Sequence, residues 1–320
     1  MNLNKFFNNT FSNINMKEKF VNKNSIKQSC QSKSYQELPK CKRIVVIGDL
    51  HGDWDITKKI FIRYKLIDTN GKWIARPKDT QVVQVGDIVD RGGRPDTVGD
   101  ECSEIKIMDF LDEIHEQAQL YGGGVYCILG NHEIMNVVGN FTYAGEESIK
   151  CFGGEDMRKK AFKPGGYMAK RFACTRNAVM KIGSFLFVHG GFNEKHLTKS
   201  IPEINSIMRK YLNGAKELYD KDFIDYYMAY NGILWNRELS IGSPDCEKLE
   251  KILKHFKVNG LIVGHTVQTN GINSKCNNKI WRVDTGMSKA FGSEENIQVL
   301  EILDDGEKLR SNNYKPFRTL

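Results

Sequence analysis

Side chains that commonly bind metal ions occur at five places in the chain, each directly after a short apolar run and next to glycine. In chain order the segments are Gly48-Asp49-Leu50-His51-Gly52, Gly86-Asp87-Ile88-Val89-Asp90-Arg91-Gly92, Gly130-Asn131-His132-Glu133, His189-Gly190-Gly191 and Gly264-His265-Thr266. Mixed carboxylate and imidazole ligands suit divalent transition metals such as Mn, Fe or Zn, whereas ligand sets made only of oxygen suit Mg or Ca. There are too many potential ligands for one closed site. Two metal ions that share a carboxylate would use the whole set, and such pairs hydrolyse phosphate esters.

Each segment also has a purely structural interpretation. Asp49 is of a type favoured in turns after strands, and Asn131 is a good residue with which to begin a helix. His189 and His265 could each be a hydrogen-bonded structural histidine at the end of a strand. The neighbouring glycines, however, allow the backbone to approach an ion closely. The five segments taken together therefore favour a metal site.

The ordered set GDLHG, GDIVDRG, GNHE, HGG and GHT resembles the calcineurin-like metallophosphoesterases, and GDIVDRG with GNHE is similar to their phosphoprotein phosphatase branch. Within that branch, GNHEIMN (130–136), GHTVQ (264–268) and RVDTGMS (282–288) look most like the bacterial-type Shewanella-like phosphatases. The resemblance covers residues 43–303. Leu129 stands where the eukaryotic protein phosphatases have Arg, and no segment like their C-terminal SAPNYC is found. Both phosphotyrosine and phosphoserine or phosphothreonine proteins are known substrates of the family, so the resemblance leaves the amino acid open.

The resemblance implies which residues hold two metal ions. The first ion would be bound by Asp49, His51 and Asp87, and the second by Asp87, Asn131, His189 and His265. Asp87 is a plausible bridge because a carboxylate has two oxygens. A hydroxide held between the two ions would attack phosphorus in line, with no covalent enzyme intermediate.

The remaining implied residues act on the substrate. His132 would donate a proton or hold the leaving oxygen, with Asp90 fixing the tautomer of its ring. Arg91 would bind phosphoryl oxygens, since a guanidinium fork matches two of them. Asn131 would also face the substrate, and Arg237 is a candidate second phosphate-binding arginine. The plainer alternatives are a local salt bridge between Asp90 and Arg91 and an ordinary surface role for Arg237.

These inferences predict a phosphoprotein phosphatase with two divalent cations, manganese first and iron or zinc as alternatives. The substrate would be a phosphoprotein or phosphopeptide. One alternative is a hydrolase of dinucleoside polyphosphates or other small phosphodiesters, whose base could stack on an aromatic residue of residues 140–178 (Phe141, Tyr143, Phe152 or Tyr167). Another is a scaffold that keeps the fold without turnover, but such a protein would be expected to lack ligands, and none is missing from the sequence.

Hydrophobic patterning indicates the elements that position these residues. Strands are predicted at 44–47, 81–85, 125–129, 185–188, 261–263, 280–283 and 297–303, and helices at 55–66 and 105–120. Their alternation predicts a layered α/β fold, and the resemblance implies four layers, with two central sheets flanked by helices. Ligand sites in such folds gather at the carboxyl ends of strands. Residues 140–178 fit neither periodicity and are predicted to be an insertion that acts as a binding loop or lid.

Composition changes sharply near residue 43. Residues 1–42 are rich in Asn, Lys and Ser and are predicted to be a flexible basic arm, with one phosphoesterase domain at 43–320. The net charge is +8, and residues 1–43 hold nine basic and two acidic side chains. The folded part is therefore almost neutral, which argues against a nucleic-acid-binding surface.

The remaining predictions concern location and single residues. Eight cysteines without a CxxC pair predict reduced thiols and cytoplasmic residence. No apolar stretch approaches the length of a membrane span. His115, His196 and His255 lie in polar helical stretches and are predicted to face solvent. The oligomeric state stays open.

Overall fold

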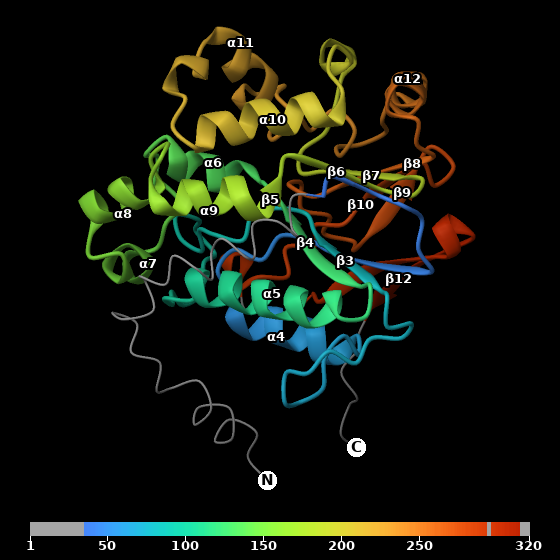
Figure 1. The fold of residues 1–320 in the computed structure, drawn as a ribbon, viewed down its shortest axis with the longest axis horizontal. Helices are drawn as coiled ribbons and strands as arrows, with labels where there is room; N and C mark the ends of the chain where they lie inside the picture. The colour runs from blue at the N-terminus through green and yellow to red at the C-terminus, as the bar shows by residue number, and fades with distance from the viewer. Residues whose placement is uncertain (1–34, 293–295, 314–320) are drawn as a thin grey trace.

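The computed structural model describes residues 35–292 and 296–313. Two six-stranded sheets lie between layers of helices (Figure 1). The strand order is β12-β11-β2-β3-β4-β5 in one sheet and β1-β6-β7-β8-β10-β9 in the other. The predicted layered α/β fold with two central sheets is confirmed.

The first sheet is mixed. Its strands are β2 (Arg43–Ile47), β3 (Gln81–Gln84), β4 (Gly124–Ile128), β5 (Arg176–Asn177), β11 (Gln298–Leu303) and β12 (Lys308–Asn313). β2, β3, β4 and β5 run parallel to one another, whereas β11 is antiparallel to both β2 and β12. Because β2, β3 and β4 are parallel neighbours, the loops that follow them leave the sheet at one edge.

The second sheet brings two further strands to the same region. Its members are β1 (Glu37–Leu38), β6 (Val179–Ile182), β7 (Phe185–Val188), β8 (Gly260–Val263), β9 (Asn273–Lys275) and β10 (Ile280–Arg282). β7 and β8 are parallel, and their pairing runs from Phe185↔Gly260 to Val188↔Val263. The loops after these two strands therefore also emerge together.

Alternation along each strand divides the core into two clusters. In β2, Ile44 and Val46 join the cluster that includes Phe187 of the other sheet, while Val45 and Ile47 join the cluster that the helices cover. All four side chains are buried. A strand buried on both faces has a continuous apolar sequence, which is why this strand was predictable.

Helices close both outer faces. α4 (Trp54–Arg63) and α5 (Glu104–Gln119) lie on the side of the first sheet, and α10 (Ile201–Leu212) and α12 (Cys246–Phe256) on the side of the second (Figure 1). α6 (Asn131–Val137) begins directly after β4. A short helix α11 (Lys221–Phe223), continued by a π-helical turn at Ile224–Met228, follows α10.

The insertion is more regular than its sequence predicted. Residues 140–178 contain α7 (Glu146–Cys151), α8 (Glu155–Phe162) and α9 (Tyr167–Thr175), followed by β5. Each helix is short and is separated from the next by glycine. The helical periodicity therefore extends over too few residues to be recognised in the sequence. α9 packs against α10, which joins the insertion to the rest of the fold.

Two residues of the predicted arm pair with the second sheet. Glu37 and Leu38 form β1, which pairs in parallel with Lys181 and Ile182 of β6. A two-residue strand is too short to give a periodic signal in the sequence. Residues 1–34 of the predicted arm lie outside the described residues.

The prediction of reduced thiols is wrong for five of the described cysteines, of which Cys174 is one. Cys102 is bonded to Cys151, and Cys246 to Cys276, across 49 and 30 residues of sequence. Sequence spacing alone does not reveal which cysteines meet in space. Within the described ranges no helix combines the length and apolar character needed to cross a membrane. Cytoplasmic residence stays a prediction.

Two of the three histidines predicted to face solvent are buried. His115 Nδ1 contacts the main chain of Val125, and His196 Nδ1 accepts a hydrogen bond from Asn193 N. Burial lowers the pKa of His196 to about 3. His255 is exposed as predicted. The two errors arose because both residues lie on the core-facing side of their helical turns.

Candidate active site

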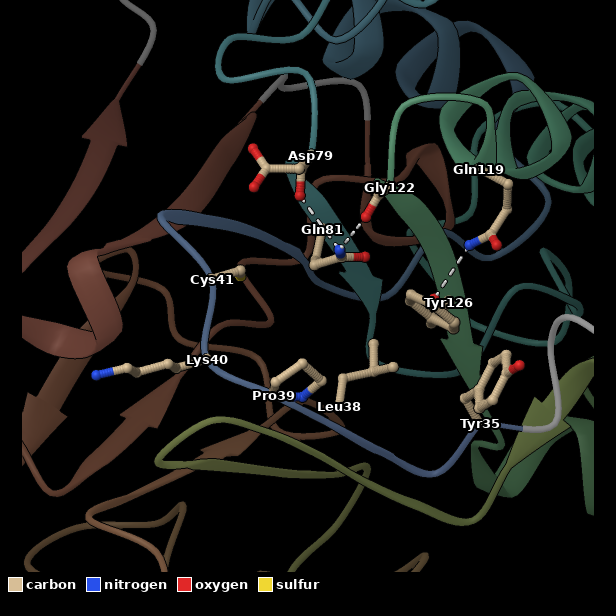
Figure 2. Close-up of a pocket in the computed structure, with 10 residues that line it drawn as sticks. All are labelled: Tyr35, Leu38, Pro39, Lys40, Cys41, Asp79, Gln81, Gln119, Gly122 and Tyr126. Carbon is tan, nitrogen blue, oxygen red and sulfur yellow. Dashed lines mark hydrogen bonds between the residues drawn. The ribbon is translucent and has the colours of Figure 1, made fainter.

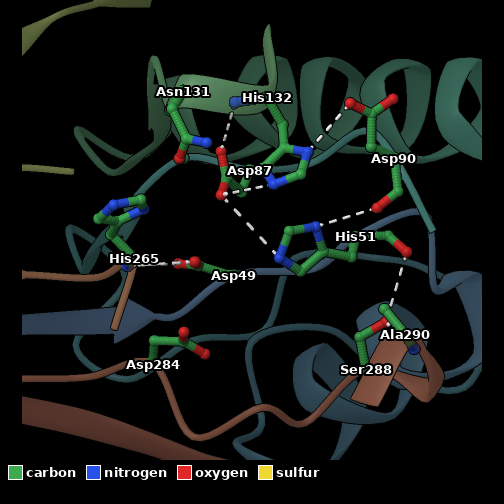
Figure 3. Close-up of polar contacts among 12 residues, drawn as sticks. Asp49, His51, Asp87, Asp90, Asn131, His132, His265, Asp284, Ser288 and Ala290 are labelled. Atoms are coloured by element: carbon green, nitrogen blue, oxygen red, sulfur yellow. Dashed lines mark hydrogen bonds and ion pairs between the residues drawn. The ribbon is translucent and has the colours of Figure 1, made fainter. Parts of the chain in front are cut away.

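The residues singled out by type and spacing come together at the carboxyl ends of five strands. Asp49 and His51 follow β2, Asp87 and Asp90 follow β3, and His132 lies in the first turn of α6 after β4. The loops after β7 and β8 supply His189 and His265 from the other sheet. Figure 3 shows the Asp87 carboxylate directed toward both His51 and His132, with Asp49 beside His265. The site thus lies at the edge shared by both sheets.

Asp87 is common to two groups of possible metal ligands. One group is His51, Asp87 and His132, and the other is Asp87, His189 and His265, with potential ligand atoms within 4.8 Å of one another in each group. Asp87 Oδ2 lies 3.2 Å from His189 Nε2, 3.9 Å from His51 Nε2 and 3.8 Å from His132 Nε2. Asp87 Oδ1 instead accepts a hydrogen bond from His132 N at 3.0 Å.

The other two predicted ligands lie against these groups. Asp49 Oδ2 accepts a hydrogen bond from His265 N at 3.1 Å, and Asn131 Oδ1 lies 2.9 Å from His189 Nε2. A Cβ on Gly130 would overlap Asp87, and one on Gly264 would lie 2.6 Å from Asp49 Oδ1. Both glycines are therefore required for this close approach. All six predicted metal ligands are gathered in one place and are buried.

The backbone at the site adopts conformations that most residues avoid. His51, Asp87, Asp90 and His265 all have positive φ, at 40°, 53°, 71° and 65°. Such strain at non-glycine residues persists where the surroundings hold it, and it concentrates at functional sites. One such support is Glu133, whose carboxylate accepts hydrogen bonds from Gly130 N, Asp87 N and Ile88 N. Glu133 thus fixes the loop that carries Asp87.

Within the protein itself, the negative charges of the site's carboxylates are not balanced by positive charges. Burial, Asp284 and Asp87 raise the pKa of Asp49 well above its usual value. Burial opposes ionisation of Asp87 as well, but His189 and His132 hold the pKa of Asp87 well below its usual value. Asp284 is a further buried carboxylate, and burial raises its pKa to about 6. The sequence did not single out Asp284, although it lies in the RVDTGMS segment.

Two of the imidazoles favour the neutral form that binds metal, whereas at His189 the effect of burial is outweighed by Asp87, which raises the pKa of that ring. Burial and then Arg94 lower the pKa of His51, and burial and then His189 lower the pKa of His265, both well below the usual value. Neutral imidazole is the metal-binding form. His265 Nε2 and Asp284 Oδ2 are buried, and among residues 35–292 and 296–313 neither has a hydrogen-bond partner. A divalent cation would satisfy these atoms and the crowded carboxylates, so the donor set fits the metals that the motifs imply.

His132 and Asp90 form a pair beside the metal ligands. His132 Nδ1 lies 3.0 Å from Asp90 Oδ2, which leaves His132 Nε2 facing Asp87. Asn136 Nδ2 donates to both oxygens of Asp90, at 2.9 and 2.8 Å. Asp90 is therefore placed to set the tautomer and orientation of the His132 ring, whereas the adjacent Arg91 lies against Glu101 and Asp53.

A buried arginine from the insertion completes this support, and sequence reasoning missed it. Arg158 in α8 has no exposed surface, and its Nη2 lies 3.1 Å from Asp90 Oδ1. Arg158 Nη1 donates to Glu104 Oε2 at 2.9 Å, and Arg158 Nε donates to Asn136 Oδ1 at 2.7 Å. Its polar neighbours in α8 give no sign of burial in the sequence. Arg158 therefore connects the insertion to the active site through Asp90, the partner of His132.

The two predicted phosphate-binding arginines have different surroundings. Arg91 Nη1 lies 2.7 Å from Glu101 Oε1, and Arg91 Nη2 donates to Val98 O and lies 3.8 Å from Asp53 Oδ2. Its guanidinium is thus already paired with protein acids. Arg237 Nη1 donates to His265 O at 2.8 Å, so Arg237 is half-buried at the border of the site.

A pocket of about 270 Å³ lies elsewhere in the molecule. Its lining includes Gln81 at the start of β3 and Gly122 just before β4, so it is at the end of these strands opposite the site (Figure 2). Gln81 Nε2 donates to Asp79 O and Gly122 O. Burial raises the pKa of the nearby Cys41 thiol to about 11, which leaves it protonated. This pocket offers no catalytic group.

Comparison with known proteins agrees with the fold and the site. Residues 42–269 match the family model for calcineurin-like phosphoesterase, and the chain belongs to this family. It is therefore a phosphoesterase, a class of hydrolase.

Two relatives of the chain are named protein phosphatases. Shewanella-like protein phosphatase 2 of Arabidopsis thaliana is 33% identical over 86% of this chain and 78% of its own length. Shewanella-like protein phosphatase 1 of Plasmodium berghei is 32% identical over 85% of this chain and 76% of its own. A solved structure of a cold-active protein tyrosine phosphatase superposes with a TM-score of 0.71 at 23% identity, covering 89% of this chain and 82% of its own. This last likeness concerns the fold.

Proposed function

We propose that the chain is a dimetal phosphoprotein phosphatase that hydrolyses phosphate monoesters of Ser, Thr or Tyr, with manganese as the first candidate metal. The observation that carries the proposal is the position of Asp87. Its Oδ2 faces His51 on one side and His189 on the other, so a single carboxylate is shared by two groups of potential ligands. A shared carboxylate is the device by which two cations are held close together.

The remaining ligands divide between the two ions. Asp49 and His51 would complete the first ion, while Asn131, His189 and His265 would complete the second. Bound cations would activate a water molecule for attack and neutralise charge on the phosphoryl oxygens. The buried Nε2 of His265, which has no hydrogen-bond partner among the described residues, supports this assignment.

His132, held by Asp90, would supply the proton to the leaving oxygen. His132 Nε2 faces Asp87, while Nδ1 is held by Asp90 at 3.0 Å. In this orientation Nε2 is the atom that can protonate the leaving oxygen of a phosphate monoester. Asn136 and Arg158 fix Asp90 in turn, so the ring is held before the substrate arrives.

The relatives support a phosphoprotein substrate, because the printed names of two of them are protein phosphatases. The insertion gives little support to the dinucleotide alternative. Phe152 packs against Phe162, with ring centroids 5.2 Å apart, and Tyr143 packs against His132 at 5.0 Å. Of these two rings of the insertion, Tyr143 contacts the site and Phe152 does not.

A substrate panel combined with metal analysis tests the proposal. Purified protein loaded with Mn²⁺ should hydrolyse p-nitrophenyl phosphate and a phosphopeptide, and a chelator should abolish both activities. Asp87→Asn should lower the bound metal at both positions, whereas the exposed Asp222→Asn serves as the matched control. Faster turnover of diadenosine tetraphosphate than of phosphoserine and phosphotyrosine peptides would favour the small-substrate alternative. Two bound metals without any turnover would instead support the scaffold hypothesis.

A further inference from the structure

Arg94, which the motif analysis did not single out, reaches the two imidazoles on the substrate side of the site. Its Nη2 lies 3.1 Å from His132 Nε2 and 3.4 Å from His51 Nδ1. Its Nη1 donates to Asp90 O at 3.3 Å and to Gly92 O at 3.2 Å. The guanidinium therefore touches the His132 nitrogen that would face the leaving oxygen.

Two aromatic rings contact this guanidinium. Arg94 Cζ lies 4.9 Å from the ring centroid of Tyr143 and 4.9 Å from that of Phe291. Tyr143 comes from the insertion, and Phe291 from the 3-10 turn Lys289–Phe291 after β10. Cation–π contacts with both rings help to orient the fork.

The loop that carries Arg94 is tied to both of these segments by main-chain hydrogen bonds. Gly92 N donates to Tyr143 O at 2.7 Å, and Val98 N donates to Lys289 O at 2.8 Å. The disulfide Cys102–Cys151 joins the same region to α7. The arginine and its two rings are therefore held in place by three separate parts of the chain.

The charge on Arg94 is available to a ligand, in contrast to the charge on Arg91. Arg91 pairs with Glu101 and faces Asp53. In the part of the chain that the structure describes, Arg94 forms no ion pair, although the carboxylates of Asp87 and Asp90 act on it from a greater distance. Its partners are imidazole nitrogens and carbonyl oxygens, which bind a guanidinium less strongly than a phosphoryl dianion would.

We propose that Arg94, which contacts Tyr143 and Phe291, binds the phosphoryl group of the substrate. The inference rests on the proposed phosphatase activity and names the recognition group of that site. On binding, the fork exchanges its contact with His132 Nε2 for phosphoryl oxygens. Nε2 is thereby released toward the leaving oxygen, and Tyr143 and Phe291 act as positioning residues.

Binding of inorganic phosphate and steady-state kinetics test this assignment together. Calorimetry on the Mn²⁺-loaded protein should show phosphate affinity about tenfold to a hundredfold weaker in Arg94→Met, the loss expected for charge-assisted hydrogen bonds. The KM for p-nitrophenyl phosphate should rise by a similar factor, with metal content unchanged. Arg94→Lys should recover only part of the affinity because a lysine cannot make the bidentate contact. The exposed Arg76→Lys is the matched control.

Tyr143 sharpens the test. Tyr143→Leu should raise KM a few-fold, and Tyr143→Phe should not, because it keeps the ring face. Phosphate affinity kept in Arg94→Met would overturn the inference. If wild-type protein with metal neither binds phosphate nor hydrolyses esters, the proposed function fails, and this outcome is distinct from a failure at Arg94.

Discussion

The metal-ligand cluster and the Arg158 cluster lie side by side and share Asp90 as a neighbour, yet their polar groups are balanced in opposite ways. In the first, Asp49, Asp87 and Asp284 are crowded together, and the buried Asp284 Oδ2 has no partner in the described part of the chain. In the second, every N–H of Arg158 has an acceptor, and two carboxylates face one cation. The first cluster is incomplete without a cation, whereas the second is complete within the protein.

The metal-ligand cluster is destabilising until a metal ion binds, whereas the Arg158 cluster stabilises the fold around the active site. Crowded buried carboxylates cost stability until a cation binds them. A buried arginine with all its partners stabilises the fold only as a set, and removing one member leaves a buried charge unpaired. Mutations in the two clusters should therefore affect activity and stability in opposite proportions.

Asp49→Asn gives the largest expected effect on activity. It should lower kcat/KM for p-nitrophenyl phosphate by more than about 10³-fold, the scale of losing one electrostatic group at a reacting centre. Stability of the metal-free protein should stay the same or rise, because an amide keeps the contact with His265 N and removes a carboxylate whose pKa is raised by burial and by Asp284. Denaturant titration in a chelator measures the second effect. Marked destabilisation of the metal-free variant would contradict the comparison.

His132→Ala should give the next largest loss of activity. Turnover should fall by roughly 10² to 10⁴, the range for general acid–base assistance. Metal content should remain near normal, because His132 is assigned to the proton and not to an ion. Elemental analysis of the purified variant distinguishes the two roles, since loss of a metal would make His132 a ligand, as its membership of one potential ligand group allows.

Arg158→Met should affect stability more than activity. It should lower the free energy of unfolding by about 3–5 kcal/mol, because Asp90 and Glu104 lose their shared buried cation. Arg158→Lys should lose less, since it keeps the charge but not the five-donor geometry. Activity of the folded fraction should fall less than in Asp49→Asn. A variant that unfolds at the same denaturant concentration as wild type would show that the cluster does not support the fold.

The metal-ligand cluster could be predicted from the sequence because its signal is local. Asp49, Asp87 and His265 each stand within a few residues of an apolar strand and beside a glycine. Parallel strands then bring their ends to one edge, so the neighbourhood of these residues follows from the fold class alone. The same reasoning predicted the long strands and the two long helices.

The Arg158 cluster could not be predicted in this way. Arg158 lies 54 positions from Glu104 and 68 from Asp90, and nothing in the sequence around it marks it as buried. The same holds for Cys102 and Cys151, which are 49 residues apart. Contacts of this kind depend on how three short helices pack after the sheet has formed, and neither periodicity nor motif spacing records that arrangement.

The pH dependence of stability gives the smallest effect and tests the metal-ligand cluster directly. The pKa of Asp284 is raised by burial from 3.8 to about 6 in the folded protein. Between these values the native state keeps a proton that the unfolded chain has lost, so the stability of the metal-free protein falls as pH rises from about 4 to about 6. One proton gives a slope of at most about 1.4 kcal/mol per pH unit.

Asp284→Asn should remove this part of the slope, because an amide does not titrate. The measurement is the free energy of unfolding in a chelator at several pH values, with Asp222→Asn as the control for an exposed carboxylate. The two curves should diverge above pH 4, with Asp284→Asn the more stable near pH 7. Parallel curves for wild type and Asp284→Asn would mean that the carboxylate is accommodated without a cation, and the contrast with the Arg158 cluster would then no longer hold.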